Sequence, residues 1–188
     1  ASSSNVSCFG GTNGSAQVNV SAGTGPFTYA WLPSVGNGST ASNLSAGSYT
    51  VNVTDINGCT SSTSIVISQP SLLTVTIPST TNVLCNGAST GSVTSVASNG
   101  TAGYTYQWNT GATTATINNL TAGTYTVTAT DANGCTTSTT ATITQPTLVT
   151  VAIPSTTNVL CNGGATGSVT SVASNGTAGY TYQWNTGA

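Results

Sequence analysis

Residues 120–138 read LTAGTYTVTATDANGCTTS, and this stretch carries the main signals for the fold of the chain. Tyr125–Thr130 and Thr136–Ile143 are rich in Thr, Val, Ile and Tyr, which favour β-strands. Between them lies the four-residue sequence DANG, Asp131–Gly134. Asn-Gly is the strongest short signal for a β-hairpin, because both residues tolerate the positive φ of a type I′ turn. The stretch therefore predicts two antiparallel strands joined by a tight turn.

A tyrosine precedes each copy of this hairpin at a fixed spacing. The pattern Leu-x-x-Gly-x-Tyr ends at Tyr125 and occurs again at Tyr49. In immunoglobulin-like sandwiches, a tyrosine near the start of a late strand sends its hydroxyl back to upstream backbone, in a tyrosine corner. The pattern predicts such a corner at both positions.

The chain consists of internal repeats. Residues 74–112 and 150–188 align without gaps at an offset of 76 positions, and a more divergent copy lies upstream, where residues 44–62 match residues 120–138. We predict a first β-sandwich repeat over 1–77, a second over 78–153, and a partial third over 154–188. Gln69-Pro70 is the alternative to Pro78 as the boundary between the first two repeats. If Ala1 is a true start, Leu72–Ile77 completes the first repeat. Because a repeat is interrupted at residue 188, we expect a longer array.

The fold class predicted is all-β: tandem immunoglobulin-like β-sandwiches of about 76 residues, as beads on a string. No helical periodicity is visible. The strands expected in the second repeat are Leu72–Ile77, Asn82–Cys85, Ser92–Ala97, Tyr104–Trp108, Thr113–Ile117, Tyr125–Thr130 and Thr136–Ile143.

Charge is almost absent from the sequence. There are 0 Lys and Arg, 0 His and 2 Asp and Glu in 188 residues, whereas about a quarter of an average soluble protein is charged. Nucleic acid is not an expected partner, because binding to phosphates depends on Lys and Arg. No apolar run approaches the roughly 20 residues that span a bilayer, so we expect no membrane insertion.

The same composition removes most catalytic chemistry. Without His or Lys there is no Ser-His-Asp triad, imidazole ligand or Schiff base. Asp55 and Asp131, the two carboxylates, lie one repeat apart and do not predict a paired acid–base site. We therefore expect no enzyme, no catalytic residue and no cofactor.

The five cysteines predict disulfides and an oxidising compartment. Cys8 and Cys59 are 51 positions apart, and Cys85 and Cys135 are 50 apart, so we favour pairing within a repeat, with the partner of Cys161 missing. Pairing of Cys59 with Cys85, between repeats, is the alternative. Free buried thiols are a weaker interpretation, and a metal site is weaker still because the cysteines do not cluster.

Several motifs together resemble a known family. The segments NVLCNGASTGSVT (82–94), GYTYQWNTG (103–111), LTAGTYTVTATDANGC (120–135) and TITQP (142–146) are similar to the SprB-type repeats of cell-surface adhesins in Bacteroidota. The resemblance covers nearly the whole chain. It implies a long repetitive surface filament, in some members serving gliding motility, exported by the type 9 secretion system. It implies no ligand and no catalytic residues.

Two features allow a binding site in each repeat. Tyr104, Tyr106 and Trp108 alternate and so share one strand face, which we interpret as sandwich core, with a platform stacking on sugars as the alternative. Asp55 and Asp131 each open an Asp-x-Asn-Gly sequence. We interpret it as a turn in which Asp accepts backbone N–H bonds, with a calcium site as a weak option.

The function expected is a repetitive extracellular structural or adhesive filament segment of a secreted bacterial surface protein. Its expected partners are neighbouring copies of itself or adjacent repeats. The alternative is a multivalent glycan-binding adhesin module with one weak site per repeat, whose avidity comes from the array.

Overall fold

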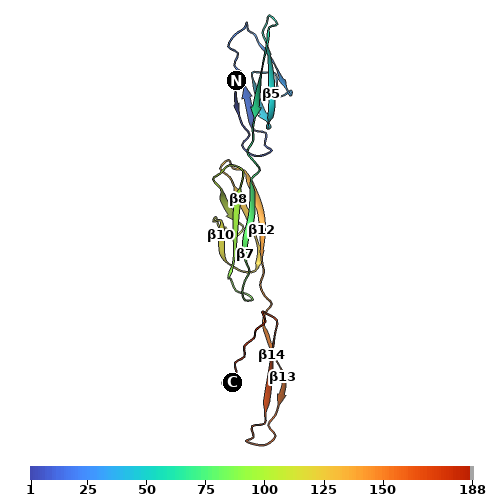
Figure 1. Ribbon diagram of the computed structural model, residues 1–188, viewed down its shortest axis with the longest axis vertical. Helices are drawn as coiled ribbons and strands as arrows, with labels where there is room; N and C mark the ends of the chain where they lie inside the picture. Colours follow the sequence, from blue (N-terminus) through green and yellow to red (C-terminus); the bar gives the residue numbers. More distant parts are fainter. Residues whose placement is uncertain (187–188) are drawn as a thin grey trace. The chain divides into compact units, whose positions relative to one another are not determined.

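The computed structural model describes residues 1–186, and every regular element in that range is a β-strand (Figure 1). The chain groups into two compact units. One is formed by residues 1–76, 96–113 and 127–139, and the other by the remaining described residues from Ile77 onward. No helix that could cross a bilayer is present among residues 1–186. The fold class predicted from the sequence is confirmed.

Two three-stranded antiparallel sheets form the first repeat. Their orders are β1-β2-β4 and β3-β5-β6. The strands are β1 (Ser2–Ser4), β2 (Gly14–Gln17), β3 (Thr28–Leu32), β4 (Thr40–Leu44), β5 (Gly47–Thr54) and β6 (Thr60–Ile67).

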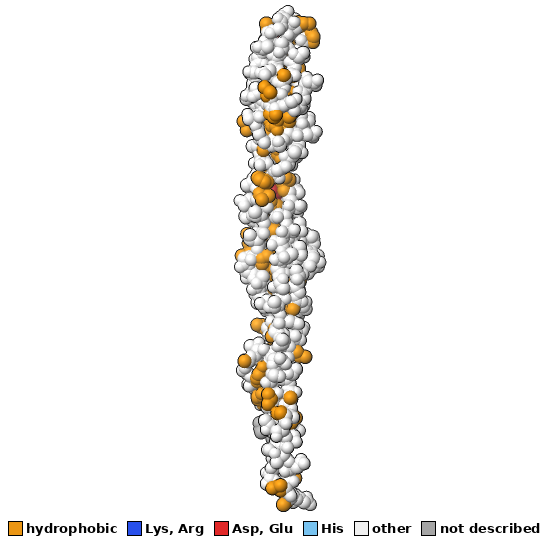
Figure 2. All heavy atoms as spheres, turned by 90° about the vertical axis from the view of Figure 1, so that its right-hand side faces the viewer, with side chains coloured by type: hydrophobic (Ala, Val, Ile, Leu, Met, Phe, Trp, Pro, Cys, Tyr) orange, Lys and Arg blue, Asp and Glu red, His pale blue; other side chains and the backbone are white. Residues whose placement is uncertain are grey.

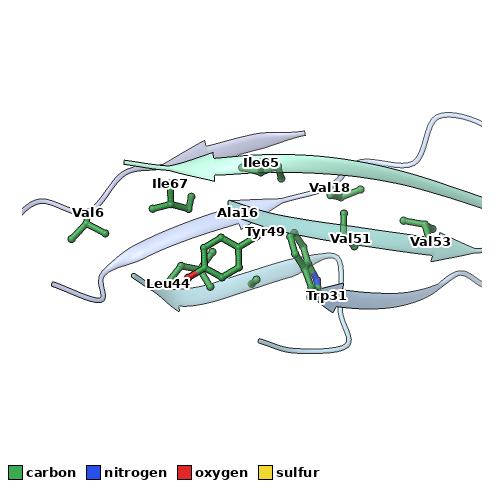
Figure 3. Packing of buried hydrophobic residues seen from close by; sticks show 11 residues of the cluster. Val6, Ala16, Val18, Trp31, Leu44, Tyr49, Val51, Val53, Ile65 and Ile67 are labelled. Atoms are coloured by element: carbon green, nitrogen blue, oxygen red, sulfur yellow. The ribbon is translucent and has the colours of Figure 1, made fainter. Parts of the chain in front are cut away.

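The core of the first repeat lies between these sheets (Figure 3). Alternate residues of β5 point inward, so that Tyr49, Val51 and Val53 are buried while their neighbours are not. Trp31 from β3 is 3% exposed and its Nε1 donates to the carbonyl of Gly38 at 2.9 Å. Because the inner faces of both sheets are buried against each other, the first repeat is a β-sandwich.

The second repeat has the same strand arrangement. Its sheet orders are β10-β8-β7 and β12-β11-β9. The strands are β7 (Thr74–Thr81), β8 (Gly91–Ser98), β9 (Thr105–Trp108), β10 (Thr116–Leu120), β11 (Gly123–Thr130) and β12 (Thr136–Ile143). In the partial third repeat, β13 (Thr150–Thr157) pairs with β14 (Ser168–Ser174), and its last residues, 187–188, lie outside the described range.

One strand differs from its predicted place. Leu72–Ile77 does not complete the first repeat, because β7 runs through Pro78 and joins the sheet of the second repeat. β7 is an edge strand, where proline is tolerated because it has no N–H to donate. A repeat boundary at Gln69-Pro70 keeps the whole of β7 in one repeat. The division into three repeats remains a prediction.

Asn82–Cys85 is a loop and not a strand. The side-chain oxygen of Asn82 accepts from the N–H of Thr144, and the N–H of Val83 donates to the Thr144 carbonyl, both at 2.9 Å. A turn follows at Cys85, where Gly87 has a φ of 76°. The loop thus closes over the end of β12 instead of extending the sheet.

Both tyrosine corners are confirmed. The hydroxyl of Tyr49 donates to the carbonyl of Ser45 at 3.1 Å, and that of Tyr125 donates to the carbonyl of Thr121 at 2.9 Å. Each bond fixes the bend that leads into the long strand of the hairpin.

Candidate functional site

The hairpin between β11 and β12 is organised by Asp131. One carboxylate oxygen, Oδ1, accepts from the N–H groups of Asn133 and Cys135, both at 2.9 Å. The other, Oδ2, accepts from the N–H of Thr101 at 2.9 Å, which ties the turn to the loop before β9. Asp55 makes the same bonds in the first repeat, to Asn57, Cys59 and Thr24.

The turn differs in detail from the type I′ turn predicted. Gly134 has a φ of 82° and Gly58 one of 83°, but the asparagines before them do not have positive φ. The N–H of Gly134 donates to the Asp131 carbonyl at 3.0 Å, so a type I turn is followed by a left-handed glycine. The Asp side chain favours this form because it bonds the N–H two residues on.

These hydrogen bonds lower the pKa of both aspartates. For Asp131 the largest cause is the Thr101 N–H, and for Asp55 it is the Cys59 N–H, since donors stabilise the charged form. The carboxylates therefore face N–H donors, whereas calcium needs 6–8 oxygen ligands. In residues 1–186 no group of three or more His, Cys, Asp or Glu could hold a metal. The geometry fits the turn interpretation, and it gives the calcium option no further support.

The turn ends in a disulfide to another repeat. Cys135 is bonded to Cys8, 127 positions away, with a Cα–Cα distance of 5.7 Å. Cys59, Cys85 and Cys161 are free and exposed. The predicted pairs Cys8–Cys59 and Cys85–Cys135 were wrong.

Strand length explains the error. The loop of Cys8 is held at the end of β6, because the N–H of Val6 donates to the Ser68 carbonyl at 2.9 Å. Cys59 immediately precedes β6, so the two cysteines are separated by the length of an eight-residue strand, roughly 26 Å. A disulfide requires Cα atoms within about 7 Å. Cys85 and Cys135 lie at opposite ends of β12 in the same way.

A hydrogen bond and a cavity lie beside the disulfide. The side-chain nitrogen of Asn133 donates to the carbonyl of Ser7 at 3.0 Å and to Oγ1 of Thr101 at 2.9 Å. A cavity of about 330 Å³ lies beside the bond, bordered by Phe9 and Leu73 among others. We call the loop from Val6 to Gly10 together with the 131–135 hairpin the joint. The joint is covalent at Cys8–Cys135, and the hydrogen bond from Asn133 to Ser7 adds about 1 kcal/mol.

The cysteine loop has a fixed shape before it meets the hairpin. The N–H of Gly10 donates to Oε1 of Gln69 at 2.7 Å, and the N–H of Gly11 donates to the Cys8 carbonyl at 3.0 Å. The second repeat repeats both bonds, from Gly87 to Gln145 and from Ala88 to Cys85. The loop is therefore preorganised in both repeats, which lowers the entropy lost when it binds.

The predicted aromatic face is turned inward. Trp108 is 2% exposed and so offers no ring face to a sugar. Tyr104 and Tyr106 are half-buried and pack against Leu73, Ala97 and Ala129. Their hydroxyls are bonded to backbone: that of Tyr104 donates to the Asn99 carbonyl at 2.7 Å, and that of Tyr106 accepts from the Ala97 N–H at 3.1 Å.

Comparisons with known proteins agree with the repeat pattern. The SprB repeat family matches residues 1–36, 77–113 and 153–188, which is more than half of the chain. SprB repeats occur in cell-surface proteins, and repeat families of this kind are typically non-enzymatic. No curated protein matches the chain.

Three solved structures are similar at low identity. The three N-terminal domains of the Highly Immunogenic Outer Capsid protein of bacteriophage RB49 are 16% identical, with a TM-score of 0.48, over 93% of this chain and 68% of that one. The amphioxus IgVJ-C2 molecule is 19% identical, with a TM-score of 0.33, over 72% and 97%. Domains 4–9 of the surface layer protein SbsC are 15% identical, with a TM-score of 0.26, over 76% and 27%.

The family match covers the loops of Cys8, Cys85 and Cys161. It also covers the strands that carry Trp31 and Trp108 in the two complete repeats. The chain belongs to the SprB repeat family, and it is a segment of a repetitive surface protein.

Proposed function

We propose that this segment is a structural part of an extracellular bacterial surface filament, in which consecutive repeats are covalently joined to resist extension. The observation that carries the proposal is the disulfide from Cys8 to Cys135, which links the loop of one repeat to the hairpin of the next. A bond inside one repeat would stabilise only that repeat. A bond between repeats fixes the joint covalently.

The disulfide changes the path of a pulling force. Tension that enters before Cys8 crosses the sulfur bridge to Cys135, so the backbone between them carries none of it while the bridge is intact. The bridge thus protects most of two repeats from being unfolded by extension. Such protection is useful in a filament and has no evident use in a freely diffusing protein.

The surface chemistry is compatible with an exposed position outside the cell. Figure 2 shows a face made mainly of uncharged polar side chains and backbone, with scattered apolar side chains. Export by type 9 secretion would bring the chain into an oxidising compartment, where the disulfide can form. Proteases that cut after Lys or Arg find no site in the sequence.

The alternative of a glycan-binding module has less support. Stacking on sugars requires an exposed ring face, and the two tryptophans of the complete repeats are buried. A glycan array with the chain would separate the alternatives: specific binding of a sugar by each repeat would favour the adhesin module over a structural segment.

Single-molecule extension of the 188-residue chain tests the structural proposal. Without reductant, about 127 residues should be unavailable for extension, which shortens the unfolded contour by roughly 440 Å at about 3.5 Å per residue. With reductant, or in the Cys8→Ser and Cys135→Ser variants, the missing length should return. Equal contour lengths with and without reductant would contradict the force-bearing bridge.

A further inference from the structure

The cavity at the joint is formed by parts of the chain that are far apart in sequence. Its volume is about 330 Å³, and its walls come from the loop of Cys8, residues 71–73 and the hairpin residues 131–137. All of these residues belong to one compact unit. Small-molecule sites in proteins have volumes of about 300–1,000 Å³, so this cavity has room for one small ring.

The aromatic ring of Phe9 borders the cavity and is not required by the fold. Phe9 is 52% exposed, and the equivalent residues in the other two cysteine loops are Asn86 and Asn162. The backbone bonds that shape the loop are the same in the second repeat, where asparagine replaces the phenylalanine. The ring is therefore free to contact a ligand, and Leu72, which is 56% exposed, extends this apolar surface.

Three hydroxyl groups border the same cavity. They belong to Ser71, Thr136 and Thr137. Within residues 1–186 these hydroxyls form no hydrogen bond with the protein. A hydroxyl can donate one hydrogen bond and accept two, so all of this capacity is available to a ligand.

Charge limits the ligand to neutral molecules. Asp131 is the ionisable group at the cavity, since Cys8 and Cys135 are joined in the disulfide. The sequence has no Lys, Arg or His to pair with an anion, so the carboxylate would repel an anionic ligand. The same carboxylate is 5% exposed and already accepts from three backbone N–H groups, so it is a poor partner for a cation.

We propose that this cavity binds one pyranose ring of a neutral hexose. A pyranose combines an apolar ring face with a rim of hydroxyls, and the cavity combines an aromatic ring with three hydroxyls. The ring face stacks on Phe9 beside Leu72. The sugar hydroxyls exchange hydrogen bonds with Ser71, Thr136 and Thr137. There is one such site at the joint, and it is separate from the inward-facing aromatic residues of β9.

The disulfide assembles the site. Phe9 lies on the loop side of the joint and the two threonines lie on the hairpin side, and Cys8–Cys135 is the covalent link between them. Binding should therefore require the oxidised chain. A bound sugar should in turn slow reduction of the disulfide, since an attacking thiolate must reach a sulfur atom that borders the cavity. The site does not rest on the proposed mechanical role: failure of sugar binding would leave the expected contour lengths unchanged.

The test is NMR titration of the nitrogen-15-labelled 188-residue chain with the methyl glycosides of glucose, galactose and mannose. At least one of them should shift the amide signals of Phe9 and Gly134, and reduction of the disulfide should abolish these shifts. Glucuronic acid, which is anionic, should bind more weakly by about tenfold. The absence of shifts at the joint with all three glycosides at about 0.1 M, where a Kd of about 10 mM gives near saturation, would overturn the proposal. Equal shifts before and after reduction would overturn it as well.

Variants at the cavity separate binding from folding. Phe9→Asn should weaken sugar binding by about tenfold without changing the melting temperature, because Asn86 occupies the equivalent position in the same loop. Phe9→Tyr keeps the ring and should retain binding. Thr136→Val removes one hydroxyl and should weaken binding by about threefold. Leu84→Ala, which changes an exposed side chain of another cysteine loop, is the control and should have no effect. Equal affinities of Phe9→Asn and the parent chain would refute the site.

Discussion

Asp55 and Asp131 accept the same three backbone N–H bonds in two equivalent turns, but only Asp131 is buried, at 5% exposure. The bond from Thr24 to Asp55 is 3.3 Å long, and that from Thr101 to Asp131 is 2.9 Å. The turn covered by a neighbouring loop is therefore the more tightly bonded of the two.

The two aspartates should determine how stability depends on acid. Both have a folded pKa below the ordinary value of about 3.9, so the unfolded state binds more protons when the pH falls. Their contribution is full above about pH 5 and is lost as the pH falls through the folded pKa values. Since the sequence has no His, Lys, Arg or Glu, the melting temperature should be flat between about pH 5 and 7.

Substitution separates the two contributions. Asp131→Asn should lower the melting temperature at pH 7 and weaken the decline in acid, and Asp55→Asn should do so to a smaller extent. Thermal unfolding followed by circular dichroism at several pH values measures both. A melting temperature that changes steeply between pH 5 and 7 would contradict this assignment.

The tryptophan of β9 should be essential to the second sandwich. Trp108→Ala removes a side chain that is 2% exposed, and it should cost about 3–5 kcal/mol of unfolding free energy. Leu84→Ala, at a position 73% exposed, is the matched control and should change stability by less than about 0.5 kcal/mol. Denaturant unfolding measures both, and similar effects of the two variants would mean that Trp108 is not core.

The tyrosine corners should contribute through their hydroxyls. Tyr125→Phe keeps the ring and removes the bond to the Thr121 carbonyl, which should cost about 1 kcal/mol. Tyr49→Phe removes the equivalent bond from a more deeply buried residue and should cost at least as much. Unchanged stability in both variants would show that the corner is a packing feature alone.

Gly91 lies where two strands approach closely. A Cβ at this position would lie 2.9 Å from the Leu120 carbonyl oxygen and 2.9 Å from Cγ2 of Ile143, and backbone cannot move aside easily. Gly91→Ala should therefore destabilise by about 1–3 kcal/mol. Gly123→Ala meets nothing nearer than Tyr125 at 3.9 Å, so it is the control expected to be near neutral. The prediction fails if the two variants have the same melting temperature.

Local signals in the sequence were sufficient for most of the fold. The alternation in β11 and β12, the turn at Asp131 and the corner at Tyr125 involve residues close in sequence, and their chemistry specifies the local geometry. The strand through Pro78 was divided because Leu72–Ile77 was assigned to the first repeat on the assumption that Ala1 is a true start. The sequence does not state that β7 is an edge strand, where proline is tolerated.

The cysteine pairing could not be read from spacing. The similar separations within two repeats suggested internal bonds, but spacing does not say at which end of a strand each cysteine lies. The length of β6 was the available signal, since its eight residues place Cys59 and the loop of Cys8 at opposite ends of one sandwich. Pairing across repeats depends on how a loop of one repeat meets the hairpin of the next, which no local pattern encodes.

The most direct test of the bond between repeats is cleavage before aspartate, after the free thiols have been alkylated. Cutting before Asp55 and Asp131 divides the chain into residues 1–54, 55–130 and 131–188, with Cys8 in the first fragment and Cys135 in the third. Without reductant, mass spectrometry should find fragments 1–54 and 131–188 joined and fragment 55–130 free. All three fragments joined together, as bonds Cys8–Cys59 and Cys85–Cys135 would require, would contradict the covalent joint between repeats.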